Sequence, residues 1–523
     1  MTGSPDLAMG SPAARGVLAA TILGSGVASL DATVVNVALP RIGADLNAGL
    51  TALQWTINAY TLTLAGLLLL GGSLGDRLGR RRIFLVGVIW FTVASAGCAL
   101  APTAGVLIAT RALQGVGAAL LTPGSLAILE AVFRPADRAA AVGAWSGLGG
   151  VATAIGPVVG GALIGVAPWG WRLVFLLNLP LAAAVVWLTV RFVPETRDEQ
   201  AHGRLDVPGA ALAAAGLALV VYGLTTGPAG GWDAAAVTTV VAGVAVLIVF
   251  LVVEGRRDAP MMPLSLYRVR EFSAANGVTF LVYAALSGAF FLLPVQLQRV
   301  SGFSPVEAGS TLLPVTAVML LLSARMGRLA QRIGPRWPMT IGPLVAAAAL
   351  AMYVRIGADA SYVTDVLPEV LLFGLGLSIT VAPLTATVLA AAPPGQVGVA
   401  SAVNNDVART AGLLAVAVLP GLAGITPHAY DHPAELSSGF HTAVLICAGL
   451  CAAGGVLSAL LVRGRPGAFE AARREDATAL QPRCAIDAPS GRSAVTAGCR
   501  ESVGAGGEPG VEGGAPEASV GAG

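Results

Sequence analysis

The sequence contains no lysine, so all 31 of its basic residues are arginine. A phosphate-binding loop of the Walker type requires a lysine that contacts the β- and γ-phosphates of the nucleotide. The chain therefore cannot bind ATP through such a loop, and we expect no nucleotide partner. Any transport activity must draw its energy from an ion gradient or from a separate subunit.

Charged residues of both signs are scarce. They make up 11% of the chain, whereas a soluble domain contains about 25%. Apolar residues make up 55%. So few charges cannot cover a surface that faces water on all sides. The composition predicts a polytopic protein surrounded by a lipid bilayer, with no nucleic-acid partner.

Cysteine and histidine are also rare, with five and four residues. Cys447 and Cys451 are one helical turn apart, but the five cysteines form no pattern typical of a metal site or a disulfide set. His428, His432 and His441 fall in or beside one predicted loop, where we favour solvated side chains over a metal site. The chain also lacks a nucleophile–base set. The sequence therefore predicts no enzyme, no metal and no cofactor.

Long apolar runs dominate the sequence. A helix needs about 20 apolar residues to cross the hydrocarbon core of a bilayer. The run after Arg15 resembles a signal peptide, but it lacks a convincing cleavage site and leads into further spans, so we keep it as a helix. The sequence predicts fourteen membrane-spanning helices, at residues 16–39, 52–72, 82–101, 104–130, 138–165, 172–192, 207–226, 234–254, 272–296, 306–326, 337–357, 364–391, 399–424 and 439–462.

Arginine is distributed unevenly between the two predicted faces. With the N-terminus inside, most arginines fall in segments on the cytoplasmic side, in agreement with the positive-inside rule. The other face holds only Arg41, Arg172, Arg299 and Arg355. We predict a multi-pass protein of the cytoplasmic membrane, with both termini in the cytoplasm and able to work as a monomer.

The segment between the second and third predicted helices reads GGSLGDRLGRRR, residues 71–82. Its glycines let two helix ends approach closely, and Asp76 lies within reach of the arginines that follow it. This latch loop could hold neighbouring helix ends together in one conformation and release them in another. Its key residues are Gly72, Asp76, Arg77, Gly79, Arg80 and Arg81. The string resembles the signature G-x-L-[AG]-D-R-x-G-R-[RK] of the major facilitator superfamily.

A degraded second copy of the latch loop follows the tenth predicted helix, at residues 327–334, with Gln331 in the place of Asp76. A displacement of eight helices implies two six-helix halves with two helices inserted between them. The resemblance implies the all-α major facilitator fold, with the substrate site between the halves near the membrane midplane. The expected parts are a cytoplasmic N-terminal segment (1–15), an N-terminal six-helix bundle (16–193), a connector with two extra helices (194–271), a C-terminal six-helix bundle (272–463) and a disordered cytoplasmic tail (464–523).

Two ionisable residues lie inside predicted helices, where a charge is costly and marks a functional candidate. Asp31 is nine positions before Pro40, and Arg111 is seven positions after Ala104. At a rise of about 1.5 Å per residue, both lie roughly 10–14 Å below the same face, so they should pair. We expect Asp31 to take up and release a coupling proton, tuned by Arg111 and Gln114. The alternative is a permanent structural ion pair.

Further strings resemble motifs of the fourteen-helix drug/proton antiporters of that superfamily: L-D-x-T-V-V-N-V-A-L-P from Leu30, R-x-x-Q-G-x-G from Arg111, and W-R-L-V-F-L-L-N-L-P from Trp171. The fifth predicted helix resembles their motif G-x8-G-x3-G-P-x2-G-G, with Ala152 in the place of the second glycine. Proline and glycine make a pliable, closely packed helix, and in the family this motif marks exporters. The alternative is a generic packing helix. The matched residues are Gly143, Gly156, Pro157, Gly160 and Gly161.

A second polar cluster lies in the thirteenth predicted helix and consists of Asn404, Asn405, Asp406 and Arg409. Asp406 and Arg409 are three positions apart and can pair on one helix face. Two interpretations stay open: a second proton site or inner gate, and a capped, partly solvated helix start.

The substrate cavity is expected between the halves. Aromatic walls with a few polar groups would suit a flat, amphiphilic molecule. The ninth and tenth predicted helices carry no acidic residue beyond Glu271 and Glu307, which favours neutral or anionic substrates over cations. The candidate cavity residues are Trp55, Asn58, Tyr60, Trp145 and Tyr283, and for any single one of them packing in the core or against lipid is the alternative.

Together these features predict a proton-coupled antiporter that exports small amphiphilic compounds such as drugs or antibiotics. An uptake carrier on the same fold is one alternative, disfavoured by the fifth-helix motif. A membrane sensor or assembly protein that does not transport is another, but such a protein would have no need of Asp31, Arg111 and the latch loop.

Overall fold

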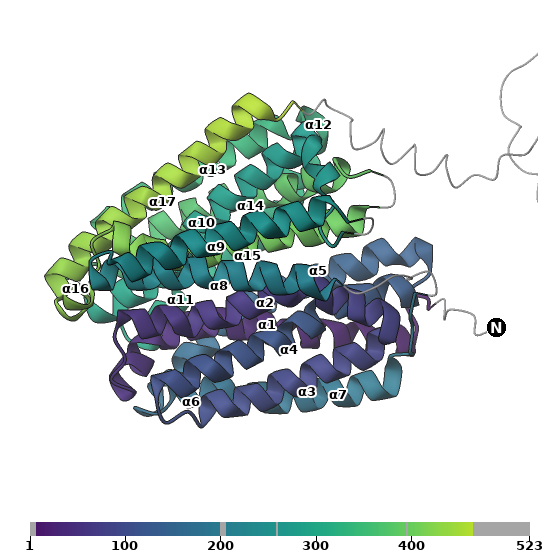
Figure 1. Cartoon of the computed structure of the whole chain (residues 1–523), viewed down its shortest axis with the longest axis horizontal. Helices are drawn as coiled ribbons and strands as arrows, with labels where there is room; N and C mark the ends of the chain where they lie inside the picture. The colour runs from purple at the N-terminus through teal and green to yellow at the C-terminus, as the bar shows by residue number, and fades with distance from the viewer. Residues whose placement is uncertain (1–6, 199–205, 258–259, 394–395, 464–523) are drawn as a thin grey trace, which may run out of the picture. The chain divides into compact units, whose positions relative to one another are not determined.

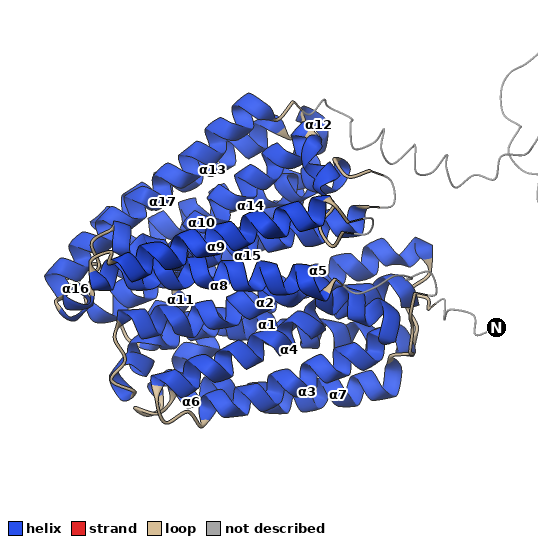
Figure 2. Ribbon diagram, viewed as in Figure 1, coloured by secondary structure: helices blue, strands red, loops and turns tan. Residues whose placement is uncertain are grey.

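The computed structural model describes residues 7–198, 206–257, 260–393 and 396–463. Every regular element in these ranges is a helix (Figure 2), so the predicted all-α class is confirmed. The predicted tail at 464–523 lies outside the described residues. The domain boundaries predicted from the sequence stay predictions.

The helices follow the predicted spans closely. The first seven are α1 (Pro12–Asp45), α2 (Leu50–Leu78), α3 (Arg80–Ala99), α4 (Ala104–Val132), α5 (Pro135–Gly165), α6 (Trp171–Leu176) and α7 (Asn178–Phe192). They are followed by α8 (Val207–Gly230) and α9 (Ala234–Gly255). The remaining elements are η1 (Leu264–Arg268), α10 (Arg270–Arg299), α11 (Pro305–Ser310), α12 (Leu313–Ile333), α13 (Arg336–Met352), η2 (Tyr353–Arg355), η3 (Tyr362–Val366), α14 (Leu367–Ala390), α15 (Val397–Leu422), α16 (Pro427–Asp431) and α17 (Pro433–Leu461).

Thirteen of the described helices are long and apolar enough to cross a membrane, when neighbouring pieces such as α6 and α7 are counted together. The fourteenth span is α15, whose apolar character is diluted by the polar cluster at residues 404–409. Two predicted spans are interrupted for a local reason, because proline has no N–H to donate to the carbonyl four residues earlier. Pro180 follows the break between α6 and α7, and Pro314 follows the break between α11 and α12.

The helices form two bundles joined by a central pair (Figure 1). The first bundle contains α1 to α7, and the second contains α10 to α17. Helix α8 packs against α2 of the first bundle and α15 of the second, where Leu62, Val221 and Leu413 share one apolar cluster. Helix α9 covers α8 and leaves valines such as Val241 exposed, as expected for a helix that faces lipid.

The same backbone device recurs at corresponding places in the two bundles. Gly79 separates α2 from α3 with φ of 114°, and Gly334 ends α12 just before α13 with φ of 86°. Positive φ is accessible to glycine at little cost and lets the chain stop one helix and start the next. This recurrence agrees with the two pseudo-repeats of the major facilitator fold.

The bundles meet near the face opposite the latch loop. The Gln54 side chain of α2 donates to the carbonyl of Val416 in α15 at 2.7 Å, and Gln298 of α10 donates to the carbonyl of Val37 in α1 at 3.0 Å. Nearer the latch face, Gly143 of α5 has only open space beside it. These two hydrogen bonds between the bundles therefore both lie near the face opposite the latch loop.

Candidate functional site

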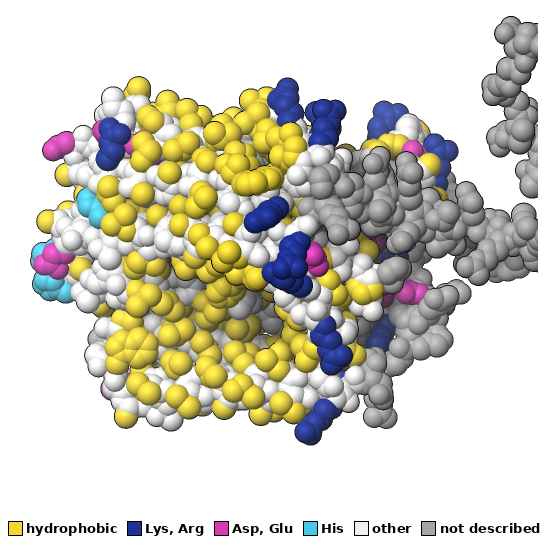
Figure 3. All heavy atoms as spheres, turned by 90° about the horizontal axis from the view of Figure 1, so that it is seen from above, with side chains coloured by type: hydrophobic (Ala, Val, Ile, Leu, Met, Phe, Trp, Pro, Cys, Tyr) yellow, Lys and Arg dark blue, Asp and Glu magenta, His cyan; other side chains and the backbone are white. Residues whose placement is uncertain are grey.

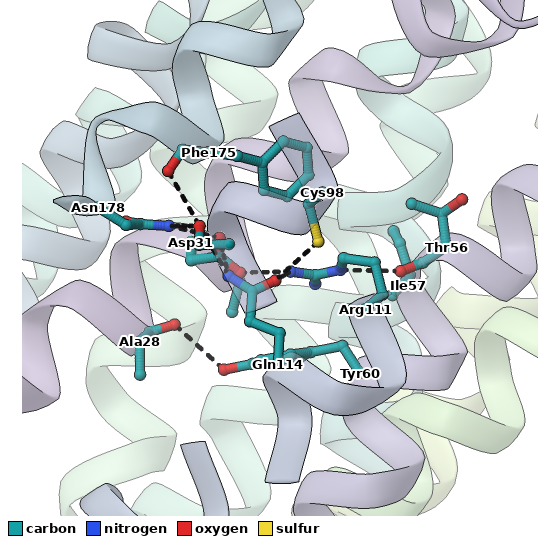
Figure 4. A network of polar contacts seen from close by, with 12 residues as sticks. Ala28, Asp31, Thr56, Ile57, Tyr60, Cys98, Arg111, Gln114, Phe175 and Asn178 are labelled. Atoms are coloured by element: carbon teal, nitrogen blue, oxygen red, sulfur yellow. Dashed lines mark hydrogen bonds and ion pairs between the residues drawn. The ribbon is translucent and has the colours of Figure 1, made fainter. Parts of the chain in front are cut away.

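Asp31 of α1 lies at the centre of a buried polar network inside the first bundle (Figure 4). Its carboxylate is 0% exposed, and the paired Arg111 side chain from α4 is 1% exposed, with 2.5 Å between Oδ2 and the guanidinium. The Gln114 and Asn178 side chains each donate to Oδ1 at 3.0 Å. Three donors from α4 and α7 thus surround one carboxylate, which offsets the cost of removing its charge from water.

The guanidinium of Arg111 is fixed from several directions. Its Nε donates to the backbone carbonyl of Thr56 at 3.1 Å, and a terminal nitrogen also donates to Gln114 at 2.6 Å. The ring of Tyr60 lies 4.3 Å from the guanidinium carbon, within the range of a cation–π contact. Arg111 therefore connects α4 with α1 and α2, and a change in the charge of Asp31 would be felt by all three helices.

Sequence reasoning missed two residues of this network. Asn178 follows directly after the break between α6 and α7, and Ser95 of α3 accepts from Asn178 at 2.9 Å and from Gln114 at 3.2 Å. Asn178 could have been found, because it is a polar residue inside an apolar span and belongs to the string that begins at Trp171. Ser95 gave no such signal, since a lone serine in an apolar helix is common.

The fifth-helix motif packs against both bundles. A Cβ on Gly160 would lie 2.8 Å from Val34 of α1, so these two helices approach closely. A Cβ on Gly161 would lie 2.5 Å from the carbonyl oxygen of Pro305 in α11, and one on Gly309 would lie 2.1 Å from that of Pro157. The glycines permit direct backbone contact between α5 and α11, and hence between the bundles.

Only Gly79 of the predicted latch loop lies outside a helix, because α2 continues to Leu78 and α3 begins at Arg80. This segment is tied to the residues that follow α7. Asp76 accepts from Arg80 at 2.8 Å, and Arg80 N–H donates to the carbonyl of Thr196 at 2.8 Å. The backbone N–H of Arg81 donates to the Glu195 carboxylate at 3.1 Å. A Cβ on Gly79 would lie 2.6 Å from that same carboxylate, and the positive φ of 114° favours glycine at this position. On α2, a Cβ on Gly72 would lie 3.5 Å from the Cβ of Pro123 in α4, which is ordinary van der Waals contact.

The second polar cluster begins two turns inside α15, which starts at Val397, so it is not a helix cap. The Asn404 side chain donates to Asn276 at 3.0 Å and to Thr279 at 2.8 Å in α10. Asp406 and Arg409 do not form the expected ion pair in the part of the chain that the structure describes; Asp406 Oδ1 and Arg409 Nε are buried without a hydrogen-bond partner. Asn405 is exposed.

Asp406 also acts on a neighbouring turn. Burial raises the pKa of the Tyr267 phenol in η1, and the nearby negative charge of Asp406 adds to the effect. Asp406 and Arg409 are thus ionisable groups on one helix, each with a buried polar atom that has capacity for a further partner. This leaves the second proton site, the inner gate and a substrate contact as possible roles.

The predicted cavity residues behave differently from one another. Tyr60 is 2% exposed and covers Arg111, so in the described conformation it belongs to the buried network. Asn58 is 0% exposed, and both its amide atoms lack a partner. Trp55 stacks at an angle near Tyr222 of α8, with ring centroids 6.1 Å apart. The two remaining candidates, Trp145 and Tyr283, are half-buried.

An apolar groove of about 770 Å³ lies between α3 and α7, away from the polar network. Its lining includes Val93, Trp187 and Val190, all largely exposed. These side chains suit contact with lipid chains. The groove is therefore not part of the candidate site.

The fold and the buried network together define a helical membrane transporter rather than an enzyme. The sequence profile of the Major Facilitator Superfamily matches residues 21–417, and the chain belongs to this family. The predicted family is thereby confirmed.

Several characterised proteins are similar to this chain. The "Tetracenomycin C resistance and export protein" of Streptomyces glaucescens is 36% identical over 403 residues, which cover 77% of this chain and 74% of that protein. The puromycin resistance protein of Streptomyces alboniger is 35% identical over 468 residues, or 87% of this chain and 92% of that protein. The methylenomycin A resistance protein of Streptomyces coelicolor is 36% identical over 447 residues, or 84% and 90%.

Solved structures share the fold at much lower identity. A bacterial homologue of the human lysosomal transporter Spinster, solved in an inward-facing and unoccupied conformation, matches with a TM-score of 0.63 at 17% identity, over 88% of this chain and 98% of that one. The POT family transporter PepTSo matches with a TM-score of 0.62 at 16% identity, over 87% of this chain and 98% of that one. At such identities the likeness concerns the fold alone.

Proposed function

We propose that this protein is a proton-coupled antiporter that exports small amphiphilic compounds across the cytoplasmic membrane. The observation that carries the proposal is the fully buried carboxylate of Asp31, held by Arg111 inside a membrane-embedded bundle. Burying an ionised carboxylate in a membrane costs free energy, so a purely structural role would be unfavourable. A carboxylate that exchanges a proton, by contrast, needs an enclosed, polar environment.

Protonation supplies the conformational change. Proton uptake removes the negative charge of Asp31 and with it the strong attraction to Arg111, which remains charged. Arg111 also holds the Thr56 carbonyl of α2, so weakening one contact shifts the balance between α1, α2 and α4. The proton gradient favours one access state, and release of the proton to the cytoplasm restores the other.

The direction of access follows from the asymmetry of the bundles. The latch face carries most of the arginines (Figure 3), which supports its assignment to the cytoplasmic side with both termini. Because the bundle contacts gather at the opposite face, the described conformation is the one that takes up substrate from the cytoplasm. The chain would work as a monomer, since both halves of the transport path lie within it.

The substrate class follows from the relatives and from the second cluster. The three characterised proteins compared above are named for resistance to, or export of, antibiotics, which supports export of compounds of that kind. Arg409 and Asp406 offer one positive and one negative partner on α15, and the half-buried ring of Tyr283 stands near Arg409. Such a set suits a flat molecule with a few polar groups.

The test is proton flux in proteoliposomes with an imposed pH gradient. Puromycin, tetracenomycin C and methylenomycin A are added in turn to the wild-type protein, to Asp31→Asn and to the matched control Asp233→Asn, an exposed cap of α9. We expect at least one compound to dissipate the gradient with wild type and Asp233→Asn, and none with Asp31→Asn. Compound-dependent flux that survives in Asp31→Asn would remove Asp31 from the coupling mechanism.

A further inference from the structure

Three potential metal ligands meet where α16 joins α17. His428 lies in α16, His432 is the residue between the two helices, and Glu435 lies in the first turn of α17. One ligand atom from each of them lies within 4.8 Å of the others, and all three residues are exposed. Within the described ranges, no other group of three histidine, cysteine or acidic side chains comes this close together.

The short helix gives these residues a fixed position. The Thr426 hydroxyl accepts from the N–H of Ala429 at 3.1 Å and caps α16. Tyr430 is buried, and proline stands in the first turn of both α16 and α17. Proline restricts the backbone before binding, so less conformational entropy would be lost when a metal ion orders the site.

The separations match those around a metal ion. Zinc–nitrogen and zinc–oxygen bonds of about 2.0–2.1 Å place neighbouring ligand atoms about 2.9–3.4 Å apart, between right-angled and tetrahedral geometry. His428 Nδ1 and Glu435 Oε2 are 3.1 Å apart, already in this range. The ring of His432 is stacked on that of His428 with the ring centroids 4.1 Å apart, and the three ligand atoms already lie within 4.8 Å of one another, so a small approach would bring His432 into this range.

One ring nitrogen of His432, Nδ1, is held by a hydrogen bond to the backbone. Its Nδ1–H donates to the backbone carbonyl of His428 at 2.8 Å, which leaves Nε2 as the acceptor atom. Metal-bound histidines usually have this arrangement, in which the second nitrogen is held by a carbonyl or carboxylate. A metal ion at His428 Nδ1 would take the place of the hydrogen bond to Glu435, and the neutral ring would then carry its proton on Nε2.

We propose that His428, His432 and Glu435 form a binding site for a divalent transition-metal ion of the zinc type, at the face opposite the latch loop. Two imidazoles and one carboxylate are a ligand set that zinc accepts, with water completing the coordination. Calcium and magnesium prefer all-oxygen sites and would bind poorly here.

The site also lies beside a contact between the two bundles. The Tyr430 hydroxyl would be 3.7 Å from a Cβ on Gly43 in α1, while the Arg299 guanidinium of α10 lies 4.6 Å above the Tyr430 ring. Arg299 is also 3.7 Å from Asp431. A metal ion that joins α16 to α17 would stiffen this contact. Occupancy would then slow the opening of this face, a consequence that rests on the proposed function.

Zinc binding is measured first, by isothermal titration calorimetry on the full-length protein in detergent without a polyhistidine tag. Cys484→Ser and Cys499→Ser are placed in the background to remove the tail thiols, which bind zinc themselves. We expect one zinc ion per chain. His428→Ala and Glu435→Gln should each weaken binding at least tenfold, whereas His441→Ala, whose ring faces the Ile356 carbonyl, should not. Absence of binding, or equal affinity in His428→Ala, overturns the site.

Transport is measured second, with zinc chloride added on the side of the proposed site. Zinc should slow efflux by the background protein and have no effect on His428→Ala. Tight zinc binding with unchanged efflux overturns the role in opening while leaving the site. The calorimetric result needs no transport, so failure of the proposed function is distinguished from failure of the metal site.

Discussion

Thr33 of α1 places its hydroxyl oxygen 3.3 Å from the carbonyl oxygen of Thr153 in α5. That carbonyl is the one left without its helical donor, because the residue four positions later is Pro157, which has no N–H. The Thr33 hydroxyl also lies 3.0 Å from the Leu30 carbonyl of its own helix, so it can donate its one proton either there or to the backbone defect in the fifth-helix motif. The same stretch of α1 contacts the proposed proton site on one side and α5 on the other.

Thr33→Val should weaken the link between α1 and α5. Valine keeps the shape of threonine but removes the hydroxyl, so the Thr153 carbonyl loses a partner at a cost of about 1 kcal/mol. We expect a small decrease in the melting temperature and a larger decrease in coupled transport. Thr92→Val is the matched control, because the Thr92 hydroxyl bonds only the Val88 carbonyl on its own helix. Equal effects of the two substitutions would argue against a special role for Thr33.

Arg111→Gln and Asp31→Asn should be less harmful together than Arg111→Gln alone. Removing only the guanidinium leaves a buried carboxylate without its counter-charge, which costs about 3–5 kcal/mol. In the double variant neither group is charged, so much of that loss should be recovered. Thermal unfolding of the wild type, both single variants and the double variant measures the coupling between the two residues. Additive losses would show that they do not interact.

Gly161→Ala should favour the state in which the bundles separate at the face opposite the latch loop. The new methyl group would lie 2.5 Å from the Pro305 carbonyl and 2.8 Å from the Cα of Val306, where neither backbone can move aside cheaply. Val166 and Val363 are both exposed and can carry spin labels. Double electron–electron resonance should report a longer distance between the two labels in Gly161→Ala than in the protein without this substitution. Gly143→Ala should leave the distance unchanged, since nothing lies within 4 Å of its Cβ position.

Gly79→Ala should destabilise the latch loop. Its φ of 114° is unfavourable for alanine, and the methyl group would lie 2.6 Å from Glu195 Oε1. The backbone conformation alone costs about 1–2 kcal/mol. Gly75→Ala is the control, because its nearest heavy atom would be 4.0 Å away and helical alanine is favourable. We expect a lower melting temperature for Gly79→Ala only; similar melting temperatures would contradict the assigned role of Gly79.

Much of the fold could be predicted from the sequence. Apolar runs of span length have few alternatives to a helix in a bilayer, because every backbone N–H and C=O must be satisfied within the segment. The helix interruptions next to Pro180 and Pro314 were not predicted. They have a similar cause, because proline lacks the N–H that would bond the carbonyl four residues earlier. The span at α15 was found despite its polar cluster, because the apolar runs on both sides of that cluster keep the required length.

The proximity of Asp31 and Arg111 followed from depth alone. A helix rises by a constant amount per residue, so two positions can be compared without knowledge of packing. The depth of a residue along its helix does not determine which faces of neighbouring helices pack together. The convergence of Asn178 and Ser95 on the carboxylate, the position of Tyr60 over Arg111 and the burial of Asn58 depend on how each helix is rotated against its neighbours.

The sequence by itself determined a lysine-free, all-helical membrane protein, and it predicted fourteen spans, a repeated glycine- and arginine-containing segment after the second and tenth spans, and a carboxylate at the depth of an arginine. Composition, run length and helical rise suffice for these features because they are local properties of the chain. The tertiary structure decided which donors hold Asp31, that Asp406 and Arg409 form no ion pair among the described residues, and that His428 and Glu435 meet. Those relationships depend on side-chain packing between helices and turns, which sequence spacing does not specify.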